Sequence, residues 1–471
     1  MIKPRLALVS AMALVVVASG CVAEATVPDE QESVAPPPPV TVESEPKEPE
    51  RTPPDWDIVP SLSDVEACKV RDGQQPEGLL LLPEGYSSEY GVRARGNVGF
   101  PLSPTTLPIQ GEANLIVAMV SFDDAPASDL TPEGFLRPQL DKMTQWSEYW
   151  SQGTFRYTFQ LVDQWVNVPI NHADYPVQPR VDQQGSRERA YEVSRQVMQA
   201  LPDDLDYESA DGVLVFWAPG IDAFEGDIGL QGNEGRPLPT PAGEKNMFFW
   251  SGNKWHYEDT GQMSAALKQE HTWSFWIYLM LDSQGLHNHG PGNGWPVGLQ
   301  QSQVPSPKFS GNIIAWDAFK LGWIRDDQVD CVVPDALESD HQVVLTAQEI
   351  EGGDRRVLIV PVDESDVLVV ESRRPVGYSA LWDETDSGLV AYTVRPTIEV
   401  INSGVQAGCG DSPDNPKWAY FLYADGFSGD CKDFSEVFIR EGQSLTHGGV
   451  TVTLEFSGPD QDYVVVSPAP N

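Results

Sequence analysis

The stretch Ala113-Asn-Leu-Ile-Val-Ala-Met-Val-Ser-Phe122 gives the strongest fold signal in this chain of 471 residues. A continuous apolar run that ends in Asp123-Asp124 is typical of a strand buried on both faces. Gly212-Val-Leu-Val-Phe-Trp217 has the same character, whereas Phe155-Arg-Tyr-Thr-Phe-Gln-Leu161 alternates as a half-buried strand does. The sequence therefore predicts a sheet built around residues 113–122.

Helical patterns alternate with these strands. Apolar residues recur at helical spacing over residues 135–150 and 186–201, and residues 261–281 form a third helical stretch. The second half of this third stretch is apolar on nearly all sides, which predicts a central, buried helix. Strands mixed with helices up to about residue 330 predict an α/β or α+β domain over residues 61–330.

The sequence pattern changes after residue 330. Short apolar runs divided by Gly, Asp and Pro predict strands, and no convincing helix separates them; the runs are 356–362, 367–371, 388–392, 449–456 and 463–466. We expect a β-rich, sandwich-like C-terminal domain over residues 331–471.

The N-terminus has the pattern of an export signal. Lys3 and Arg5 precede an apolar run from Leu6 to Ala18, which is too short for a comfortable membrane span. The run ends in Ala18-Ser-Gly-Cys21, which resembles the bacterial lipobox. This resemblance implies a lipoprotein signal peptide over residues 1–20 and a lipid on Cys21 that holds the protein at the extracytoplasmic face of the cell membrane. The alternative is an ordinary signal peptide, with Cys21 an incidental thiol.

Residues 21–60 are rich in proline and glutamate, including the run Pro36-Pro-Pro-Pro39. This composition cannot bury a core and favours an extended, self-repelling linker. The linker is interpreted either as a stalk that lifts the globular part off the membrane or as an unselected disordered tail.

The chain is strongly acidic. Its formal charge is -40, from 30 Lys+Arg and 70 Asp+Glu. Such a surface argues against nucleic acid and anionic lipid as partners. It offers oxygen ligands for Ca²⁺, for example in the run Asp203-Asp-Leu-Asp206 with Glu208 and Asp211, although this run lacks the EF-hand spacing. The alternatives are a solvated loop and an acidity that only reflects a saline or extracellular habitat.

Four cysteines remain besides Cys21, and an even number in an exported chain predicts two disulfides. Three pairings are possible. We favour Cys409 with Cys431, which are near in sequence, and this leaves Cys68 with Cys331 to join the start of the first domain to its end. No CxxC spacing occurs, so a zinc-thiolate site is not expected.

Several segments, in order, resemble secreted metallopeptidases of the immune inhibitor A type. Residues 115–123 are similar to the strand that opens that family's catalytic domain, residues 149–154 to a turn after its first helix, and residues 211–216 to its next core strand. Ile314-Ala-Trp-Asp-Ala-Phe-Lys-Leu-Gly-Trp-Ile324 resembles the closing element and is the most specific match. Val367-Leu-Val-Val-Glu-Ser-Arg-Arg374 with Gly388-Leu-Val-Ala-Tyr392 resembles a β segment. The resemblance covers roughly residues 95–400 and implies a metallopeptidase-like domain.

The chemistry that this resemblance implies needs an HExxH helix, in which two histidines grip Zn²⁺ and the glutamate activates water. The chain has seven histidines, and no two are four residues apart. Aligned on Glu270, the two ligand positions hold Gln269 and Trp273. Aligned on Gly285-Leu286, they hold Tyr278 and Asp282, and Leu279 replaces the glutamate. We therefore predict that the zinc site is lost or rebuilt.

A rebuilt site would use the one cluster of histidines in the sequence. Its candidates are His271, His287 and His289 as metal ligands, with Asp282 nearby and Glu270 as a catalytic group. The alternative is that His271 is an ordinary helix residue and that the glycine-rich stretch after residue 285 is a surface loop. We favour this alternative, and Zn²⁺ is expected only if the site is rebuilt.

Three functions remain open. The first is a non-catalytic descendant of a metallopeptidase that serves as a surface binding or structural lipoprotein. The second is an extracellular metallohydrolase or peptidase with an atypical metal site. The third is an adhesion or glycan-binding protein that uses the β-rich region, so that a peptide or cell-surface ligand is the expected partner. The missing HExxH favours the first.

Overall fold

The computed structural model describes residues 52–56, 59–71, 98–102, 107–177, 183–218, 238–245, 248–251, 272–286, 311–363, 366–380, 382–396, 408–409, 419–427 and 434–470. Residues Pro53–Asn471 form one compact unit. The expected signal peptide, Cys21 and most of the linker lie outside the described residues. Within the described part, no helix has both the length and the apolar character that crossing a membrane requires.

The first sheet is parallel and centres on the stretch that the sequence singled out. Its order is β2-β1-β4-β7, and β3 pairs with the end of β1. The strands are β1 (Gly111–Phe122), β2 (Phe155–Leu161), β3 (Val166–Val168), β4 (Gly212–Trp217) and β7 (Phe248–Ser251). The strands predicted at 113–122, 155–161 and 212–217 are confirmed.

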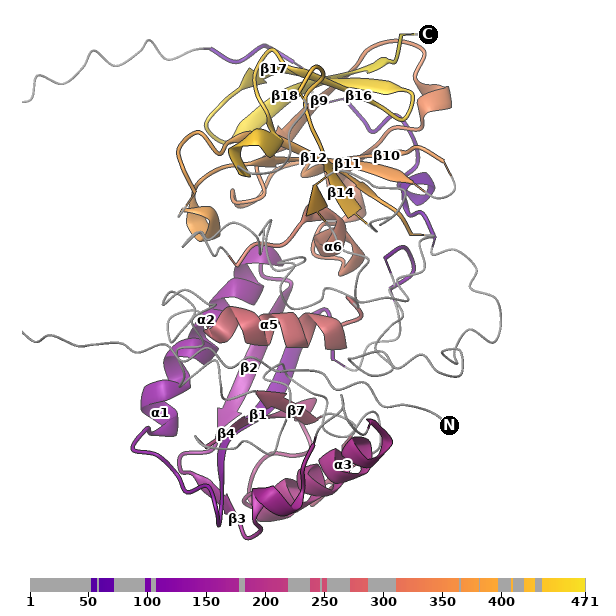
Figure 1. The fold of residues 1–471 in the computed structure, drawn as a ribbon. Helices are drawn as coiled ribbons and strands as arrows, with labels where there is room; N and C mark the ends of the chain where they lie inside the picture. The colour runs from indigo at the N-terminus through magenta and orange to yellow at the C-terminus, as the bar shows by residue number, and fades with distance from the viewer. Residues whose placement is uncertain are drawn as a thin grey trace, which may run out of the picture. The chain divides into compact units, whose positions relative to one another are not determined.

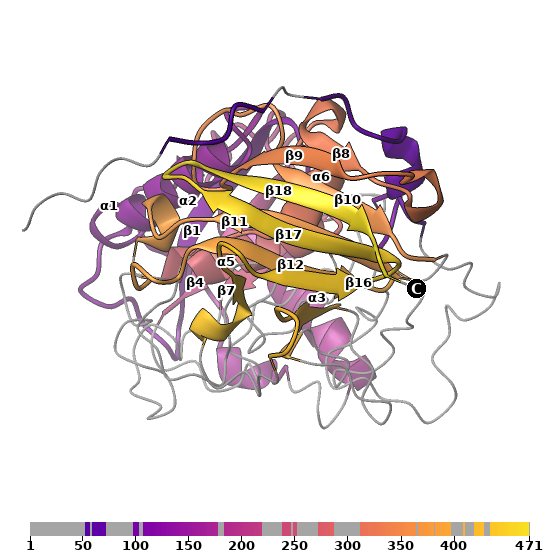
Figure 2. The same cartoon turned by 90° about the horizontal axis from the view of Figure 1, so that it is seen from above.

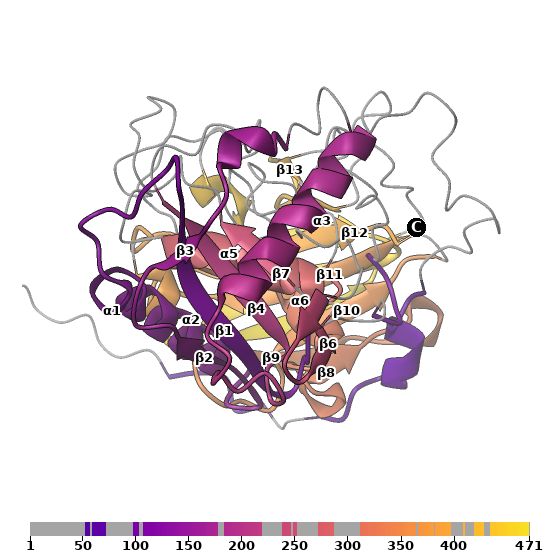
Figure 3. The same cartoon turned by 90° about the horizontal axis from the view of Figure 1, so that it is seen from below.

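Helices lie on both faces of this sheet (Figures 1 and 3). They are α1 (Pro132–Phe135), α2 (Arg137–Trp150), α3 (Gln183–Ala200) and α5 (Thr272–Ser283). The short helix α6 (Ala315–Lys320) lies next to the C-terminal strands instead (Figure 1). The helices expected at 135–150 and 186–201 correspond to α2 and α3. The helix expected at 261–281 corresponds to α5 from residue 272 onward, and its first part lies outside the described residues. A short hairpin of β5 (Leu238–Thr240) and β6 (Gly243–Lys245) stands apart from the large sheets.

Alternation along β1 divides the core between the two helical layers. Leu115, Val117 and Met119 belong to the cluster that contains residues of α2 and α5. Ile116 and Val120 point to the opposite face and belong to the cluster that contains residues of α3. Successive side chains of a strand point to opposite faces, so an uninterrupted apolar run is what a strand between two helical layers requires.

Two further sheets make up the C-terminal part. The seven-stranded sheet has the order β13-β14-β12-β11-β10-β8, with β15 beside β12, and the four-stranded sheet has the order β16-β17-β18-β9. Their strands are β8 (Val329–Cys331), β9 (His341–Thr346), β10 (Val357–Pro361), β11 (Val367–Arg373), β12 (Gly388–Val394), β13 (Gly408–Cys409), β14 (Ala419–Leu422), β15 (Phe438–Ile439), β16 (Ser444–His447), β17 (Val450–Ser457) and β18 (Gln461–Pro468). The β-rich C-terminal region is thus confirmed.

The seven-stranded sheet is covered on both faces. Leu368 and Val370 of β11 pack in a cluster with residues of the four-stranded sheet, which lies over this face in Figure 2. Val367 and Val369 point the other way, into the cluster that also holds α2, α5 and α6. One hydrophobic cluster therefore continues from the parallel sheet to the β-rich region. The domain boundary at residues 330/331 stays a prediction, and β8 already belongs to the second sheet.

Candidate functional site

Helix α5 is where the resemblance places the metal-binding motif. The rebuilt-site candidates flank it: Glu270 and His271 precede the helix, and His287 and His289 follow residue 286, so all four lie outside the described residues. Asp282 is in α5, but its side chain also lies outside the described part. No described contact therefore brings these candidates together, and the atypical metal site stays a prediction.

The described side chains of α5 belong to the core. Trp273, Trp276, Ile277, Met280 and Leu281 are buried in the cluster shared with the parallel sheet. The ring of Trp276 contacts Phe216 of β4 at a centroid distance of 4.1 Å. The prediction of a central, buried helix is confirmed for this part of the chain. Trp273, which replaces a histidine ligand in one alignment, is 5% exposed.

The end of α5 is fixed by polar contacts. The Tyr157 hydroxyl donates to Gln284 Oε1 at 2.7 Å, and Gln284 Nε2 donates to the carbonyl of Pro108. Gly285 has a φ of 93°, and the amide of Leu286 returns to the carbonyl of Leu281. This is the usual end of a helix at a left-handed glycine. The chain up to residue 286 therefore stays at the C-terminal end of α5.

An aromatic cluster joins α5 to the β-rich region. Trp273 contacts Tyr378 at 5.9 Å between ring centroids, and Tyr378 contacts Tyr149 at 5.0 Å. Trp150, the last residue of α2, packs on Tyr149 and beneath the guanidinium of Arg373. The two tyrosines are half-buried, and burial raises the pKa of the Tyr149 hydroxyl to about 12. Both hydroxyls are therefore neutral at physiological pH.

A fully buried ion network lies behind this cluster. Arg373, at 0% exposure, donates to Glu349 Oε1 at 2.9 Å and to Glu371 Oε1 at 2.8 Å, and both glutamates are equally buried. Burial lowers the pKa of Arg373, but the two carboxylates raise it further than burial lowers it, so the net shift is upward. The network is charged inside the core, where each ion depends on its partners.

The second carboxylate oxygen of Glu371 holds the N-terminus of α6. Glu371 Oε2 accepts the amide of Ala315, and Arg373 Nη2 donates to the carbonyl of Ile313. The Tyr392 hydroxyl accepts the amide of Trp316 at 3.2 Å. A helix start offers unpaired amides, which a carboxylate satisfies well. Segments 314–324 and 367–374, two of the motifs of the resemblance, are therefore in direct contact.

Asp317 is a buried acid in the same region. It lies in the first turn of α6 at 1% exposure, and its Oδ2 atom has no hydrogen-bond partner in the structure. Burial raises its pKa to about 7, Lys320 acts in the opposite sense, and Glu371 raises it further. The folded protein therefore binds a proton at Asp317 more tightly than the unfolded chain does.

This shift predicts a pH dependence of stability. A carboxyl whose pKa is 3.8 in the unfolded chain and about 7 in the folded protein favours folding below about pH 4, and this contribution is lost as pH rises to about 7. We expect Asp317→Asn to remove this pH dependence. Between pH 4 and pH 8 the free energy of unfolding of wild type should fall, relative to that of the variant, by on the order of 2–4 kcal/mol. Urea unfolding at several pH values measures it. Asp326→Asn, at an exposed carboxylate, is the control, and parallel wild-type and Asp317→Asn curves would contradict the expectation.

Apart from the buried ion network, an aspartate–histidine pair lies at the carboxyl end of the parallel sheet. Asp124 follows β1, and its carboxylate lies 2.8 Å from His172 Nδ1 and accepts the amides of His172 and Ala173. Burial opposes the shift, but these bonds lower the pKa of Asp124 to about 2. Open α/β sheets bind ligands at this edge. Here both oxygens already serve local contacts, which is a structural role.

The described residues provide little for a metal. No group of three or more His, Cys, Asp or Glu side chains is arranged to hold an ion within them. In the acidic run considered for Ca²⁺, Asp206 accepts from the amide and hydroxyl of Ser209, and Asp211 accepts the amide of Asn114. Asp206 thus caps local backbone, and Asp211 ties this segment to β1. A Ca²⁺ site in this run stays a prediction.

One of the two predicted disulfides is present. Cys68 and Cys331 are bonded, with sulfur atoms 2.09 Å apart. Cys409 lies in β13, but its side chain and all of Cys431 lie outside the described part, so that pairing stays a prediction.

No family model matches this chain, and no curated protein matches it. The resemblance described above therefore depends on its motifs alone.

Sequence reasoning missed the ion network. Its signal was present: after four apolar residues, β11 ends in Glu371-Ser-Arg373, although the strand pairs on both sides. Charged residues are almost never fully buried unless they are paired, so charges in a central strand indicate buried partners. The sequence does not reveal that Glu349, 24 positions away, is the second carboxylate that pairs with Arg373.

Proposed function

We propose that this chain is an exported lipoprotein, held by a lipid on Cys21, whose metallopeptidase-like scaffold serves as a surface binding or structural protein without ordinary zinc-peptidase activity. The observation that carries this proposal is helix α5. Its residues 272–283 contain no histidine, and its described face is packed into the core. A helix used in this way offers no pair of imidazoles one turn apart to grip Zn²⁺.

The length of α5 weighs against the alternative, an extracellular metallohydrolase with an atypical site. Twelve residues at a rise of 1.5 Å per residue span about 18 Å. His271 adjoins one end, and His287 follows Leu286, which stays at the other end. Ligand nitrogens lie about 2 Å from a zinc ion. For His271 and His287 to share one ion, the chain beyond one end of α5 would have to fold back along the helix to the other end. The alternative is kept because Glu270, His271, His287 and His289 lie close together in sequence.

A protease assay on the mature chain tests the proposal. We expect no hydrolysis of casein that a chelator abolishes, with or without added Zn²⁺. If chelator-sensitive hydrolysis occurs, the proposal is wrong, and the variants Glu270→Gln and His271→Ala locate the site. Loss of activity in both, with activity kept in the matched variant His256→Ala, would establish the atypical site.

The anchor is tested separately. We expect the wild-type protein to take up labelled fatty acid and to sediment with membranes, and Cys21→Ser to lose both properties because no thiol remains to be acylated. The readouts are label incorporation and the membrane-bound fraction after a high-salt wash, which removes peripheral proteins. Label in Cys21→Ser, or no label in wild type, contradicts the lipoprotein proposal.

A further inference from the structure

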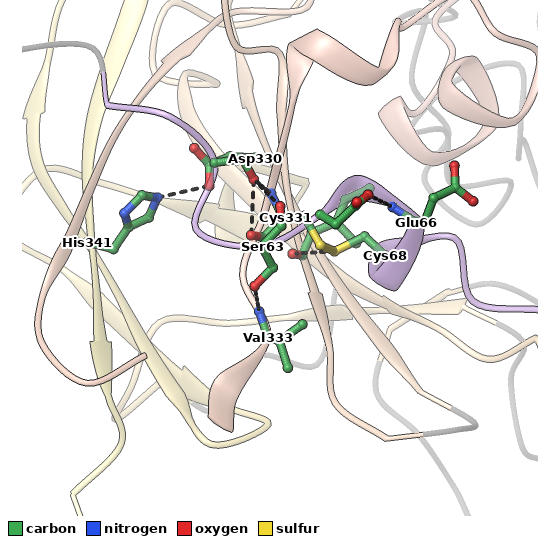
Figure 4. The surroundings of a disulfide bond; sticks show 10 residues. Ser63, Glu66, Cys68, Asp330, Cys331, Val333 and His341 are labelled. Atoms are coloured by element: carbon green, nitrogen blue, oxygen red, sulfur yellow. Dashed lines mark hydrogen bonds and ion pairs between the residues drawn. A yellow bond between two sulfur atoms is a disulfide. The ribbon is translucent and has the colours of Figure 1, made fainter. Parts of the chain in front are cut away.

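The described chain begins with a strap, residues 52–71, that crosses both sheets of the C-terminal part. Trp56 packs edge-on against Tyr463 of β18, at 5.5 Å between ring centroids, and Tyr463 in turn contacts Phe456 of β17. The strap thus starts on the four-stranded sheet. It then runs to β8, the edge strand of the seven-stranded sheet (Figures 2 and 4).

Two serines pair the strap with β8. Ser61 Oγ accepts the amide of Cys331 at 2.7 Å, and the amide of Ser63 donates to the carbonyl of Cys331 at 2.9 Å. Ser63 Oγ accepts the amide of Val333. The exposed edge of β8 therefore gains backbone partners from a segment about 270 residues away in the chain, and a covered edge strand is closed to other chains.

A covalent bond completes the junction. Cys68, at the end of the 3-10 helix η1 (Val65–Cys68), is bonded to Cys331, and both residues are fully buried. The neighbouring Asp330 accepts from His341 Nε2 at 2.9 Å, which ties β8 to the start of β9 (Figure 4). Lys69 bridges Glu66 and Asp326 at the surface. The strap is fixed to the β-rich part, and its fixed point is the sulfur–sulfur bond.

This bond changes the covalent path through the molecule. Cys68 and Cys331 are 263 positions apart, and β1 to β7 lie between them together with α1, α2, α3, α5 and α6. From the N-terminus, the shortest covalent route to the C-terminus goes through the two sulfur atoms and skips this entire stretch. The parallel sheet and its helices form a side loop.

We infer that the strap transmits mechanical force: tension on the N-terminal anchor passes through Cys68–Cys331 into the β-rich part, and residues 69–330 lie outside the path of the force. The inference rests on the proposed anchoring for its biological meaning. A surface protein built this way can hold a partner through its β-rich part while the peptidase-like part stays unstrained.

Single-molecule pulling tests the inference. The mature chain carries handles before residue 22 and after residue 471, with Cys21 replaced by serine. We expect the Cys68–Cys331 bond to remove 263 residues, or roughly 900 Å at about 3.5 Å per residue, from the contour of fully unfolded, oxidised wild type. Adding reductant after folding should release that length. The double variant Cys68→Ser with Cys331→Ser should show it from the start.

The matched control is Cys409→Ser with Cys431→Ser, which leaves the strap bond intact and should keep the 900 Å hidden. Full extension of oxidised wild type without reductant would overturn the inference, and so would release of the hidden length by the control variant. The handles replace the lipid, so this result is independent of acylation. If the Cys21 experiment contradicts the lipid proposal, the inferred force path is unaffected. If the pulling experiment contradicts the force path, the lipid proposal is unaffected.

Discussion

Arg373→Met is expected to lower the free energy of unfolding by about 3–5 kcal/mol. The substitution keeps an unbranched aliphatic stem, although a shorter one, and removes the cation that, among the described residues, pairs with both Glu349 and Glu371 within 3 Å. Both carboxylates are fully buried, so neither can exchange Arg373 for water. The carbonyl of Ile313 loses its donor as well, which loosens the start of α6. Urea unfolding followed by tryptophan fluorescence measures the change.

Two companion variants sharpen this test. Arg373→Lys should recover only part of the loss, because an ammonium cannot donate in the planar fork that reaches both glutamates and Ile313. Arg156→Met removes an ion pair with Glu112 in which both side chains are about half exposed, and it should cost far less than Arg373→Met because water can replace the partner. If Arg373→Met and Arg156→Met lower the free energy of unfolding equally, the buried network does not stabilise the contact between α6 and β11.

Replacing Cys68 and Cys331 together by serine is expected to cost on the order of 5 kcal/mol. The bond closes a loop of 263 positions, and a cross-link over so long a loop restricts the unfolded chain strongly. The double variant is used because a single substitution would leave a reactive thiol in the core. The measurement is the unfolding midpoint in urea, compared with wild type under oxidising conditions.

The control for this prediction separates the effect of the disulfide on stability from the effect of the strap's surface ion pairs. Lys69→Met breaks the ion pairs with Glu66 and Asp326, whose carboxylates are mostly exposed, so it should change stability by less than about 1 kcal/mol. An unchanged midpoint in the double cysteine variant, or a loss from Lys69→Met as large as from that variant, would contradict the account.

The parts of the fold that depend on local pattern could be predicted from the sequence. In the run at 113–122, the residues that pack against either helical layer are apolar. Its burial on both faces could therefore be predicted without knowing which helices cover it. The strand at 155–161 and the helices at 137–150 and 183–200 follow from periodicity in the same way. The short strands after residue 330 follow from their turn residues.

Features that depend on distant partners could not be predicted. Glu371 and Arg373 stand out in an apolar strand, but the sequence does not show that Glu349 reaches back to them or that Ala315 donates to Glu371. Helix α6 was matched only as a motif, because six residues are too few to show a helical period. Trp56 gives no sign in sequence that it packs on Tyr463, about 400 positions away.

The candidate site divides in the same way. The absence of HExxH is a matter of residue spacing and could be seen directly in the sequence. The burial of Trp273 and its contact with Tyr378 required the three-dimensional structure. The disulfide lies between these cases, since the count of cysteines restricts the pairing to three possibilities and the fold selects Cys68 with Cys331.

The metal content of the purified chain from residue 22 onward tests the central claim most directly. The protein is saturated with Zn²⁺, passed through a desalting column at neutral pH and analysed by elemental mass spectrometry against its peptide concentration. We predict zinc far below one atom per chain, unchanged in His271→Ala. One zinc per chain in wild type, lost in His271→Ala while the fold persists, would contradict the claim that this scaffold works without a catalytic metal.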